Sequence, residues 1–234
     1  MLNKKTFLAI IPARGGSKRL PRKNILNIAG KPLIVWTIEA ALQSQYIDTV
    51  IVTSDDEETL AVARKNGALT IDRPTELAQD TSTSFDAIEH TIRNTSKHDY
   101  IILLQPTSPL RTRKHIDEAI QLINKKNAEA VISVTEIEHS PEWINTLPAD
   151  ESMVCFLKKQ VLNKRSQDLG RYYRLNGAIY ICKTEKLLET GSFFLEEDIY
   201  AYKMPTVSSA DIDTELDFKW AEFLLSGGLP KMNS

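Results

Sequence analysis

Five cations lie between residues 14 and 23, and no acidic residue interrupts them. They are Arg14, Lys18, Arg19, Arg22 and Lys23. Such side chains neutralise an anion, and glycines such as Gly15 and Gly16 let backbone N–H groups approach it closely. The stretch ARGGSKRLPRKN therefore predicts a binding site for a polyanion such as a triphosphate. A basic loop that contacts only water is the alternative interpretation.

Two aspartates near the C-terminal end of the chain could hold a metal ion. Asp211 and Asp213 lie two residues apart in DIDTELD, so an extended backbone would place both carboxylates on one side. Carboxylate oxygens suit a hard divalent cation. The competing interpretation is helix capping by Asp213 or Thr214, with Glu215 and Asp217 near the positive end of the helix. Both interpretations can hold together.

An apolar segment precedes the cationic stretch, and a helix-like segment follows it. Residues 7–13, FLAIIPA, are typical of a buried strand. Residues 31–45 carry apolar side chains at helical spacing after a Gly-Lys-Pro start, which suits a first helical turn. The alternation continues with strands at 49–54, 68–72, 99–105 and 130–137, and with helices at 56–67, 84–95 and 113–127. This order predicts an α/β fold with a doubly wound, mostly parallel Rossmann-type sheet and helices on both faces.

Beyond residue 137 the pattern is less regular. Short strands with some antiparallel pairing are expected at 152–158, 177–183 and 193–205. Residues 213–228 predict a helix that packs on the sheet through a stripe formed by Leu216, Trp220, Phe223 and Leu224. The sequence shows no internal repeat and no low-complexity linker, so we expect one domain over residues 1–234.

The composition of the chain argues against several classes of protein. With 234 residues, of which 42% are hydrophobic and 26% charged, the chain can bury one large core. A net charge of −2 argues against a nucleic-acid-binding protein. There is no apolar run of about 18 residues and no secretion signal, so we expect a cytoplasmic protein without membrane contact. Cys155 and Cys182 lie in apolar, strand-like runs and are predicted to be reduced core thiols.

The cationic stretch occupies a position that commonly binds phosphate. In doubly wound sheets, ligands bind beyond the carboxyl ends of the strands, and the first strand-to-helix turn is the usual phosphate site. The stretch has neither the Walker A spacing nor G-x-G-x-x-G, which argues against a P-loop kinase and a dinucleotide enzyme. Gln105 would project from the end of another buried strand, where Pro106 and Pro109 stiffen the exit.

Seven motifs, in order, carry a resemblance to a known family. They are ARGGSKRLPRKN, GKPLIVWTIEAAL, IVTSDD, RPTELAQDTSTS, LQPTSPLR, RLNGAIYI and DIDTELD. Together they resemble the acylneuraminate cytidylyltransferase family over nearly the whole chain. The resemblance implies a nucleotide-diphospho-sugar transferase-like fold, with a dimerisation and sugar-site extension at about 138–205. It also implies CTP and a nine-carbon 2-keto acid sugar as substrates, Mg²⁺ as cofactor with Mn²⁺ as a substitute, and a homodimer.

The reaction implied by this resemblance is transfer of CMP from CTP to the anomeric hydroxyl of N-acetylneuraminate, with release of pyrophosphate. It implies these nucleotide contacts: Arg14, Ser17, Lys18, Lys23, Asn24, Arg73 and Ser84. It implies these sugar contacts: Gln105, Arg174, Asn176, Tyr180, Phe193 and Phe194. Among all of these, Arg14, Lys18, Lys23 and Arg174 would be catalytic, and Asp211 and Asp213 would hold the metal. Arg111 is a weaker candidate, because a loop arginine before a helix is commonly exposed.

Several of these positions also have purely structural interpretations. Ser82 or Thr83 could cap the helix at 84–95. A strand tyrosine such as Tyr180 is more often a core residue than a ligand contact. Phe193 and Phe194 cannot both bury their rings on one face of a strand, so we expect one ring to meet a partner subunit. His139 is given no catalytic role, and Trp143 is expected near the acyl group of the sugar.

The chain departs from the family pattern at two positions. Ser166 stands where the family usually has an arginine, and Gly170 stands where it has a proline. Arg165 lies one residue upstream, and a shift of one residue can turn a side chain to the other face of a strand. The alternatives to N-acetylneuraminate as substrate are legionaminate, pseudaminate and Kdo. A catalytically silent nucleotide-sugar-binding protein, which would bind CTP without turnover, is the alternative from another class.

Overall fold

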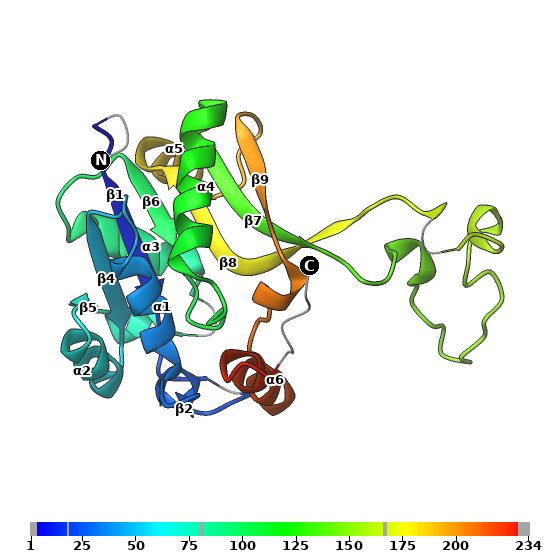
Figure 1. The fold of residues 1–234 in the computed structure, drawn as a ribbon, viewed down its shortest axis with the longest axis horizontal. Helices are drawn as coiled ribbons and strands as arrows, with labels where there is room; N and C mark the ends of the chain where they lie inside the picture. Colours follow the sequence, from blue (N-terminus) through cyan, green and yellow to red (C-terminus); the bar gives the residue numbers. More distant parts are fainter. Residues whose placement is uncertain (1–3, 18, 80–81, 166–167, 229–234) are drawn as a thin grey trace.

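The protein is described here by a computed structural model that covers residues 4–17, 19–79, 82–165 and 168–228. Within this part of the chain, seven strands form one sheet in the order β5-β4-β1-β6-β8-β7-β9 (Figure 1). The strands are β1 (Phe7–Pro12), β4 (Thr49–Ser54), β5 (Leu69–Asp72), β6 (Tyr100–Leu103), β7 (Ala130–Glu136), β8 (Tyr173–Lys183) and β9 (Ile199–Met204). The predicted alternation of strands and helices is confirmed.

The sheet is parallel except at β8. The strands β5, β4, β1 and β6 pair in parallel, and so do β7 and β9. β8 runs antiparallel to both of its neighbours, β6 and β7, so the predicted late antiparallel pairing is confirmed. Its pairing with β7 shifts register between Ile132 and Val134, so the hydrogen-bond ladder is locally irregular there. Because β1 and β6 are parallel, their carboxyl ends meet at one edge of the sheet.

Helices cover both faces of the sheet, as the sequence predicts. On one face lie α1 (Leu33–Leu42), α2 (Glu57–Lys65) and α4 (Arg113–Lys126), which pack their apolar side chains on β1, β4 and β6. On the other face lie α3 (Ser84–Arg93) and α5 (Thr184–Thr190), packed against the opposite side chains of the same strands. Asp56 caps α2 and Thr83 caps α3, each through its side-chain oxygen. The predicted α/β fold with helices on both faces is therefore correct.

The C-terminal helix, α6 (Glu215–Leu225), packs differently from the prediction. Leu216, Trp220 and Phe223 of the predicted stripe are 76%, 50% and 45% exposed. Instead, α6 buries Ala221, with Phe218 and Leu225 packed beside it, in a small core. That core lies against the start of α1 and against the hairpin of β2 (Asn27–Ile28) and β3 (Lys31–Pro32), not on the main sheet. The prediction was wrong because aromatic spacing alone does not say which side of a short helix meets a core.

A long segment between β7 and β8, described over residues 137–165 and 168–172, projects from the main body (Figure 1). Its described regular elements are the 3-10 turns η3 (Pro141–Trp143) and η4 (Lys159–Val161). The strand predicted at 152–158 is absent from this described segment, and Cys155 is exposed in a left-handed turn with φ 60°. Cys155 is therefore not the core thiol we predicted, because a short apolar run does not form a strand without a neighbour to pair with.

Cys182, in contrast, is the buried thiol that the sequence predicts. It lies in β8, and burial raises its pKa to about 12, with a smaller contribution from Glu129. In the part of the chain that the structure describes, no helix combines the length and apolar character needed to cross a bilayer.

Candidate active site

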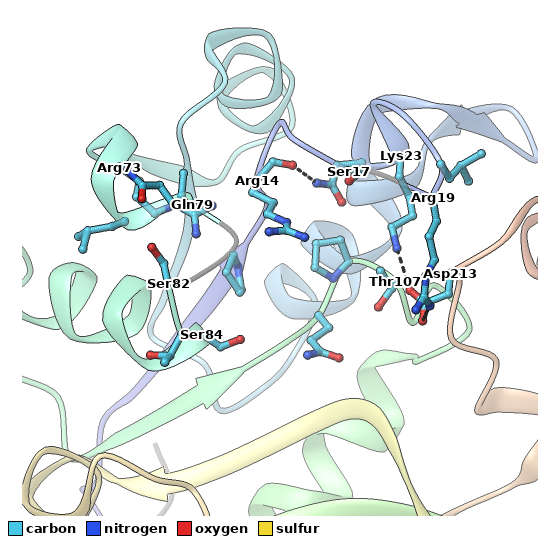
Figure 2. Close-up of a pocket in the computed structure, with 18 of the residues that line it drawn as sticks. Arg14, Ser17, Arg19, Lys23, Arg73, Gln79, Ser82, Ser84, Thr107 and Asp213 are labelled. Atoms are coloured by element: carbon cyan, nitrogen blue, oxygen red, sulfur yellow. Dashed lines mark hydrogen bonds and ion pairs between the residues drawn. The ribbon is translucent and has the colours of Figure 1, made fainter.

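A cleft of about 620 Å³ opens at the edge of the sheet where β1 and β6 end. Its lining comes from the cationic turn after β1, the segment from Arg73 to α3, the exit of β6, and the aspartates before α6. The polar and charged lining residues are Arg14, Ser17, Arg19, Lys23, Asn24, Arg73, Gln79, Ser82, Thr83, Ser84, Gln105, Thr107, Asp211 and Asp213. Figure 2 shows Arg73, Gln79, Ser82 and Ser84 toward one end, and Lys23, Arg19, Thr107 and Asp213 toward the other.

The cationic turn is held against neighbouring segments by specific hydrogen bonds. The backbone N–H of Gly15 donates to Oδ1 of Asp55 at 3.0 Å, and Nδ2 of Asn24 donates to the carbonyl of Arg14 at 3.0 Å. A Cβ atom on Gly15 would lie 3.0 Å from Cβ of Asp56, so a larger residue there would press the turn against the start of α2. Arg22 forms ion pairs with Glu58 and Asp56 instead of lining the cleft. Lys18 lies outside the described residues.

Arg73 lies at the far end of the cleft from the aspartates and is almost fully buried, with 7% of its surface exposed. Its Nη2 is 3.5 Å from the carbonyl of Thr53 and 3.9 Å from Oδ1 of Asp55, and its Nε has no partner. Burial lowers the pKa of Arg73, Asp55 opposes that shift, and Arg14 adds to it. A buried guanidinium with such weak bonds has donors available for a ligand in the cleft.

Ser84 is the first residue of α3 and lines the same end of the cleft as Arg73. Thr83 caps this helix by accepting from the backbone N–H of Asp86 at 3.2 Å, so the capping interpretation for Thr83 is confirmed. Because Thr83 carries out the capping, the hydroxyl of Ser84 is free for contacts within the cleft. The Ser82 hydroxyl donates to the carbonyl of Glu76 at 2.9 Å, which closes the loop before α3.

Asp211 and Asp213 form the opposite end of the cleft. Oδ1 of Asp211 is buried and has no hydrogen-bond partner. Its pKa is raised mainly by burial and also by Asp213, against a lowering by the hydrogen bond from Thr107 and by the charges of Lys23 and Arg174. The backbone N–H of Ile212 donates to the carbonyl of Thr107 at 2.9 Å, which fixes both aspartates beside the exit of β6.

Asp213 is more exposed than Asp211 and faces two cations of the turn. Nη1 of Arg19 is 3.2 Å from Oδ2 of Asp213, and Nζ of Lys23 is 3.4 Å from Oδ1. Nζ of Lys23 also donates to the carbonyl of Ile212, so the cationic turn and the aspartate pair are directly joined. The cations predicted to hold phosphate and the carboxylates predicted to hold a metal thus lie at one place, as Figure 2 shows for Lys23, Arg19 and Asp213.

The donor set fits a hard divalent cation. The unpartnered oxygen of Asp211 is an acceptor in a buried position, which is costly unless a cation or donor comes to it. Among the described residues, no group of three or more histidines, cysteines and acids gathers anywhere, so Asp211 and Asp213 would supply two ligands. Mg²⁺ commonly takes one or two carboxylates and completes its shell with water and substrate phosphates.

The two other acids of DIDTELD have separate contacts, in line with their omission from the metal set. The backbone N–H of Asp217 donates to Oγ1 of Thr214 at 3.3 Å, so the capping prediction for Thr214 is confirmed, and the Asp217 carboxylate accepts in return from the backbone N–H of Thr214 at 2.7 Å. Glu215 pairs with Lys219 one turn along α6, at 2.7 Å. Helix capping and a metal-binding pair therefore coexist in this turn.

Gln105 lines the cleft just beyond the end of β6, as its position in the sequence predicts. Gly177 of β8 lies against it with φ +73°, and a Cβ atom there would be 2.6 Å from Oε1 of Gln105. The same Cβ would lie 3.5 Å from Oδ2 of Asp211. Only glycine readily combines this backbone conformation with so close an approach, so Gly177 allows β8 to support Gln105 and Asp211 together.

Asn176 and Arg174 do not line the cleft. Asn176 is 1% exposed, and its amide accepts from Oγ of Ser133 at 2.6 Å and donates to Oγ of Ser209 at 2.9 Å. Arg174 is exposed and donates to the carbonyl of Ser209 at 3.3 Å, and it lies near enough to Asp211 to lower the pKa of that carboxyl. Their visible contacts fasten the segment before Asp211 to β8, while their roles toward sugar stay predictions.

Tyr180, Phe193 and Phe194 form an aromatic group beside the cleft rather than in its lining. The ring of Tyr180 is 5.8 Å from that of Phe193 and 6.5 Å from that of Phe194, between centroids. Phe193 is 8% exposed and Phe194 is 55% exposed, so the two rings are not buried together. Burial and the charge of Asp211 raise the pKa of Tyr180. Contact of this group with sugar, or with a second subunit, stays a prediction.

Sequence reasoning missed several residues of the site. Gln79 and Thr107 line the cleft, and each lies within a motif of which other residues are predicted to bind the ligand. Arg19 also lines the cleft; it belongs to the predicted cationic stretch but is not among the individual nucleotide contacts predicted from it. Arg111 was expected to be exposed, and this was wrong: it is 2% exposed, because its guanidinium turns inward between β8 and α1. A single arginine in a loop gives no periodic signal of burial, so the sequence could not reveal this.

Comparisons with known proteins agree with this geometry. The family model described as Cytidylyltransferase matches residues 8–224. An N-acylneuraminate cytidylyltransferase of Escherichia coli O18:K1:H7 is 40% identical over 216 residues, which are 92% of this chain and 51% of that protein. A CMP-N,N'-diacetyllegionaminic acid synthase of Legionella pneumophila is 37% identical, over 94% of this chain and 96% of that protein. A pseudaminic acid cytidylyltransferase of Campylobacter jejuni is 34% identical, over 93% of this chain and 95% of that protein.

The chain spans about half the length of the N-acylneuraminate cytidylyltransferases that it matches. Among solved structures, it resembles a CMP:2-keto-3-deoxy-manno-octonic acid synthetase complexed with CTP, with a TM-score of 0.73 and 20% identity. This likeness covers 96% of the present chain and 100% of the other, and it confirms the nucleotide-sugar transferase type of fold. Because the family model runs from β1 through the cleft and the aspartate pair into α6, the chain belongs to the cytidylyltransferase family.

Proposed function

We propose that this protein transfers CMP from CTP to the anomeric hydroxyl of a nine-carbon 2-keto acid sugar and releases pyrophosphate. N-acetylneuraminate is the first candidate sugar. The observation that carries the proposal is the direct contact between the cationic turn and the aspartate pair, through Lys23, Arg19 and Asp213, in the cleft of a cytidylyltransferase. A triphosphate and a hard metal ion are the ligands that such a combination favours.

The cleft has room and charge for a nucleotide in an extended arrangement. We assign Arg73 and Ser84 to the base and ribose, because both lie at the end away from the aspartates. Arg14 and Lys23 face the phosphates, with Ser17 and the hydrogen-bonded turn around Asn24 between them. Lys18 belongs to the same proposal on its sequence position alone. Positioning and charge stabilisation are the main tasks of a protein in phosphoryl-type transfer, and these residues supply both.

In the proposed reaction, the anomeric hydroxyl of the sugar releases its proton to solvent, and its oxygen forms a bond to the α-phosphorus of CTP. The bond between that phosphorus and the oxygen bridging to the β-phosphate breaks, and pyrophosphate leaves. Arg14 and Lys23 would stabilise the negative charge that builds on the leaving group, because preorganised cations in a cleft act strongly on developing charge. Arg174 is proposed as a further anchor for an anionic group, and its charge already reaches Asp211.

Asp211 and Asp213 are proposed to hold Mg²⁺, or Mn²⁺ in its place. Such an ion, when bound, would neutralise phosphate charge. The residues themselves have a second task, because Asp213 binds Lys23 and Arg19 and so holds the cationic turn beside the exit of β6.

The identity of the sugar has a second candidate with its own support. The legionaminic and pseudaminic acid relatives match this chain over 96% and 95% of their length, whereas the E. coli N-acylneuraminate relative is matched over 51%. Sequence identity is 40% with that N-acylneuraminate enzyme and 37% and 34% with the other two, whereas the chain length agrees better with the other two. Legionaminate or pseudaminate is therefore the alternative sugar for the same reaction, and Kdo has the likeness of fold alone in its favour.

A homodimer in the cytoplasm is part of the proposal. The projecting segment between β7 and β8 carries exposed apolar side chains, among them Ile144, Met153 and Val154, which are 67%, 61% and 83% exposed. Apolar side chains at this density on an extended segment favour contact with another chain. The exposed ring of Phe194 would belong to the same interface.

Pyrophosphate release over a panel of keto acid sugars tests the proposal. CTP, Mg²⁺ and the correct sugar should all be required, and ATP or GTP should not replace CTP. Asp211→Asn and Asp213→Asn should abolish turnover, and added Mg²⁺ should not restore it. Glu185→Gln is the matched control, because Glu185 is exposed on α5 and lies away from the cleft. It follows Lys183 of β8, which pairs with Tyr100 at the amino end of β6, whereas the cleft is at the carboxyl end. CTP binding without pyrophosphate release on any sugar would instead identify a catalytically silent binding protein.

A further inference from the structure

Arg111 is a buried cation whose described partners are all neutral. Its Nη1 donates to the carbonyl of Ala178 at 2.8 Å and to that of Gln105 at 3.2 Å, and its Nη2 donates to Oγ1 of Thr37 at 2.6 Å. Its Nε has no partner, and among the described residues no carboxylate lies within ion-pair distance. Burying a guanidinium with neutral partners alone is costly, so an apolar side chain would serve the core better if packing were its only role.

The three acceptors come from three different elements around the cleft. Gln105 follows β6, Ala178 belongs to β8, and Thr37 lies in α1. Arg111 therefore joins the main chain of the cleft residue Gln105 to the strand that lies against it. A planar guanidinium presents several donors in a fixed arrangement, which suits it to hold two carbonyl groups at a defined separation.

The residue beside Ala178 completes the arrangement. Gly177 lies so close to Gln105 that a Cβ atom there would be 2.6 Å from Oε1. The side chain of Gln105 thus contacts β8 one residue away from the carbonyl that Arg111 holds. If the distance between the carbonyl groups of Gln105 and Ala178 changed, the side-chain carboxamide of Gln105, which lines the cleft, would move with them.

The charge of Arg111 lies directly behind the cleft residue Gln105, whose carbonyl it contacts. No acid neutralises it at contact distance among the described residues, and a charge in the interior is screened less than one in water. Burial lowers the pKa of Arg111 to about 9, so the guanidinium remains largely protonated near neutral pH. Its potential favours an anionic group, such as a sugar carboxylate, in front of Gln105.

We propose that Arg111 is a positioning residue for the transfer reaction, which fixes Gln105 against Gly177 and Ala178 so that the carboxamide is oriented toward the acid sugar. This inference rests on the proposed function and deepens it at the sugar end of the site. It assigns Arg111 no contact with substrate.

The test separates the KM for sugar from the KM for CTP. Arg111→Met should raise the KM for the acid sugar about 10- to 100-fold, the loss expected when a binding group shifts by about 1 Å. The KM for CTP should change by less than about 3-fold, since Arg73, Ser84 and the cationic turn are untouched. Arg111→Lys should recover part of the loss, because it keeps the charge but not the paired donors. Arg113→Met is the matched control: Arg113 is exposed at the start of α4, and its removal should change neither constant.

A double-mutant cycle distinguishes positioning from general loss of structure. If Arg111 acts through Gln105, then Gln105→Ala combined with Arg111→Lys should have the sugar KM of Gln105→Ala alone. Thr37→Val removes one acceptor and leaves the charge, so it provides a milder variant if Arg111→Met does not fold. It should raise the sugar KM by a smaller factor, with CTP affinity measured by calorimetry unchanged.

Independent, multiplied effects of the Gln105 and Arg111 substitutions would overturn the inference. Equal changes in both KM values, or a change confined to CTP, would overturn it as well. A wild-type protein that releases no pyrophosphate with any acid sugar would refute the proposed function, and this inference with it. A wild-type protein that is active, with Arg111→Lys and Thr37→Val unchanged in sugar KM, would refute the inference alone.

Discussion

Gly177→Ala adds one methyl group at the point where β8 meets Gln105, and its cost can be worked from two parts. The first is backbone strain: an alanine at φ +73° is left-handed, which costs roughly 1–2 kcal/mol. For a domain of this size, 1 kcal/mol lowers the Tm by about 2–4 °C, so strain alone should lower it by about 2–8 °C.

The second part acts on the cleft. The new Cβ would lie 2.6 Å from Oε1 of Gln105, whereas ordinary contacts begin near 3.4 Å, so one of the two must move by the difference of 0.8 Å. A misplacement near 1 Å costs up to about 100-fold in rate. We therefore expect kcat/KM for the sugar to fall about 10- to 100-fold, which corresponds to about 1.4–2.7 kcal/mol of lost transition-state stabilisation.

Gly30→Ala is the matched control, because Gly30 is also left-handed, at φ +92°, and its Cβ position is open. Both variants should lose thermal stability, whereas Gly177→Ala alone should lose sugar turnover per folded molecule. The assay is pyrophosphate release at varied sugar concentration, with the folded fraction measured by circular dichroism. Equal turnover in the two variants would refute the reasoning, since it would show that the contact with Gln105 has no effect on the reaction.

Three further predictions test other parts of the account. Asp99 accepts hydrogen bonds from the backbone N–H and the hydroxyl of Thr6, and these bonds hold the pKa of Asp99 below its usual range. Asp99→Asn should therefore lower the free energy of unfolding, measured with urea at neutral pH, by no more than about 1 kcal/mol. The folded pKa is depressed, so this advantage of the wild type should fade as the pH falls below about 4, and a gap that widens toward acid would contradict the assignment. Arg73→Met should leave the Tm unchanged or raise it, because the substitution removes a buried and weakly paired charge. The same substitution should weaken CTP binding at least ~10-fold in calorimetry. Unchanged CTP affinity would exclude Arg73 from the nucleotide site. Ala221→Leu should lower the free energy of unfolding by about 1–3 kcal/mol, because the larger side chain overfills the core under α6. Leu216→Ala should change the free energy of unfolding by no more than about 0.5 kcal/mol, because Leu216 is exposed. The reverse order of the two effects would show that α6 faces the other way.

The alternating part of the fold could be predicted because its signals are local. Strands such as 49–54 and 99–105 contain the apolar runs VIV and YIILL, and helices such as 56–67 begin with a capping residue and end with glycine. The same locality fails beyond residue 137. The run at 152–158 has strand-like composition but no partner strand, and Cys155 is consequently exposed in a turn.

The candidate site likewise contains residues that could be predicted from local sequence and residues that could not. Residues inside contiguous motifs, such as Arg14, Lys23 and Ser84, line one cleft as their order along the chain suggested. Residues whose role depends on contacts between distant segments could not be found in this way. Gly177 and Arg111 are examples, because their significance comes from the approach of β8 to the exit of β6.

A crystal structure of the protein with CTP and Mn²⁺ would show whether the nucleotide phosphates and the metal bind in this one cleft, because anomalous scattering locates the metal independently of the nucleotide. We predict the triphosphate against Arg14 and Lys23, and a manganese peak bound by oxygens of Asp211 and Asp213. A nucleotide bound elsewhere, with the turn after β1 in contact only with water, would contradict it.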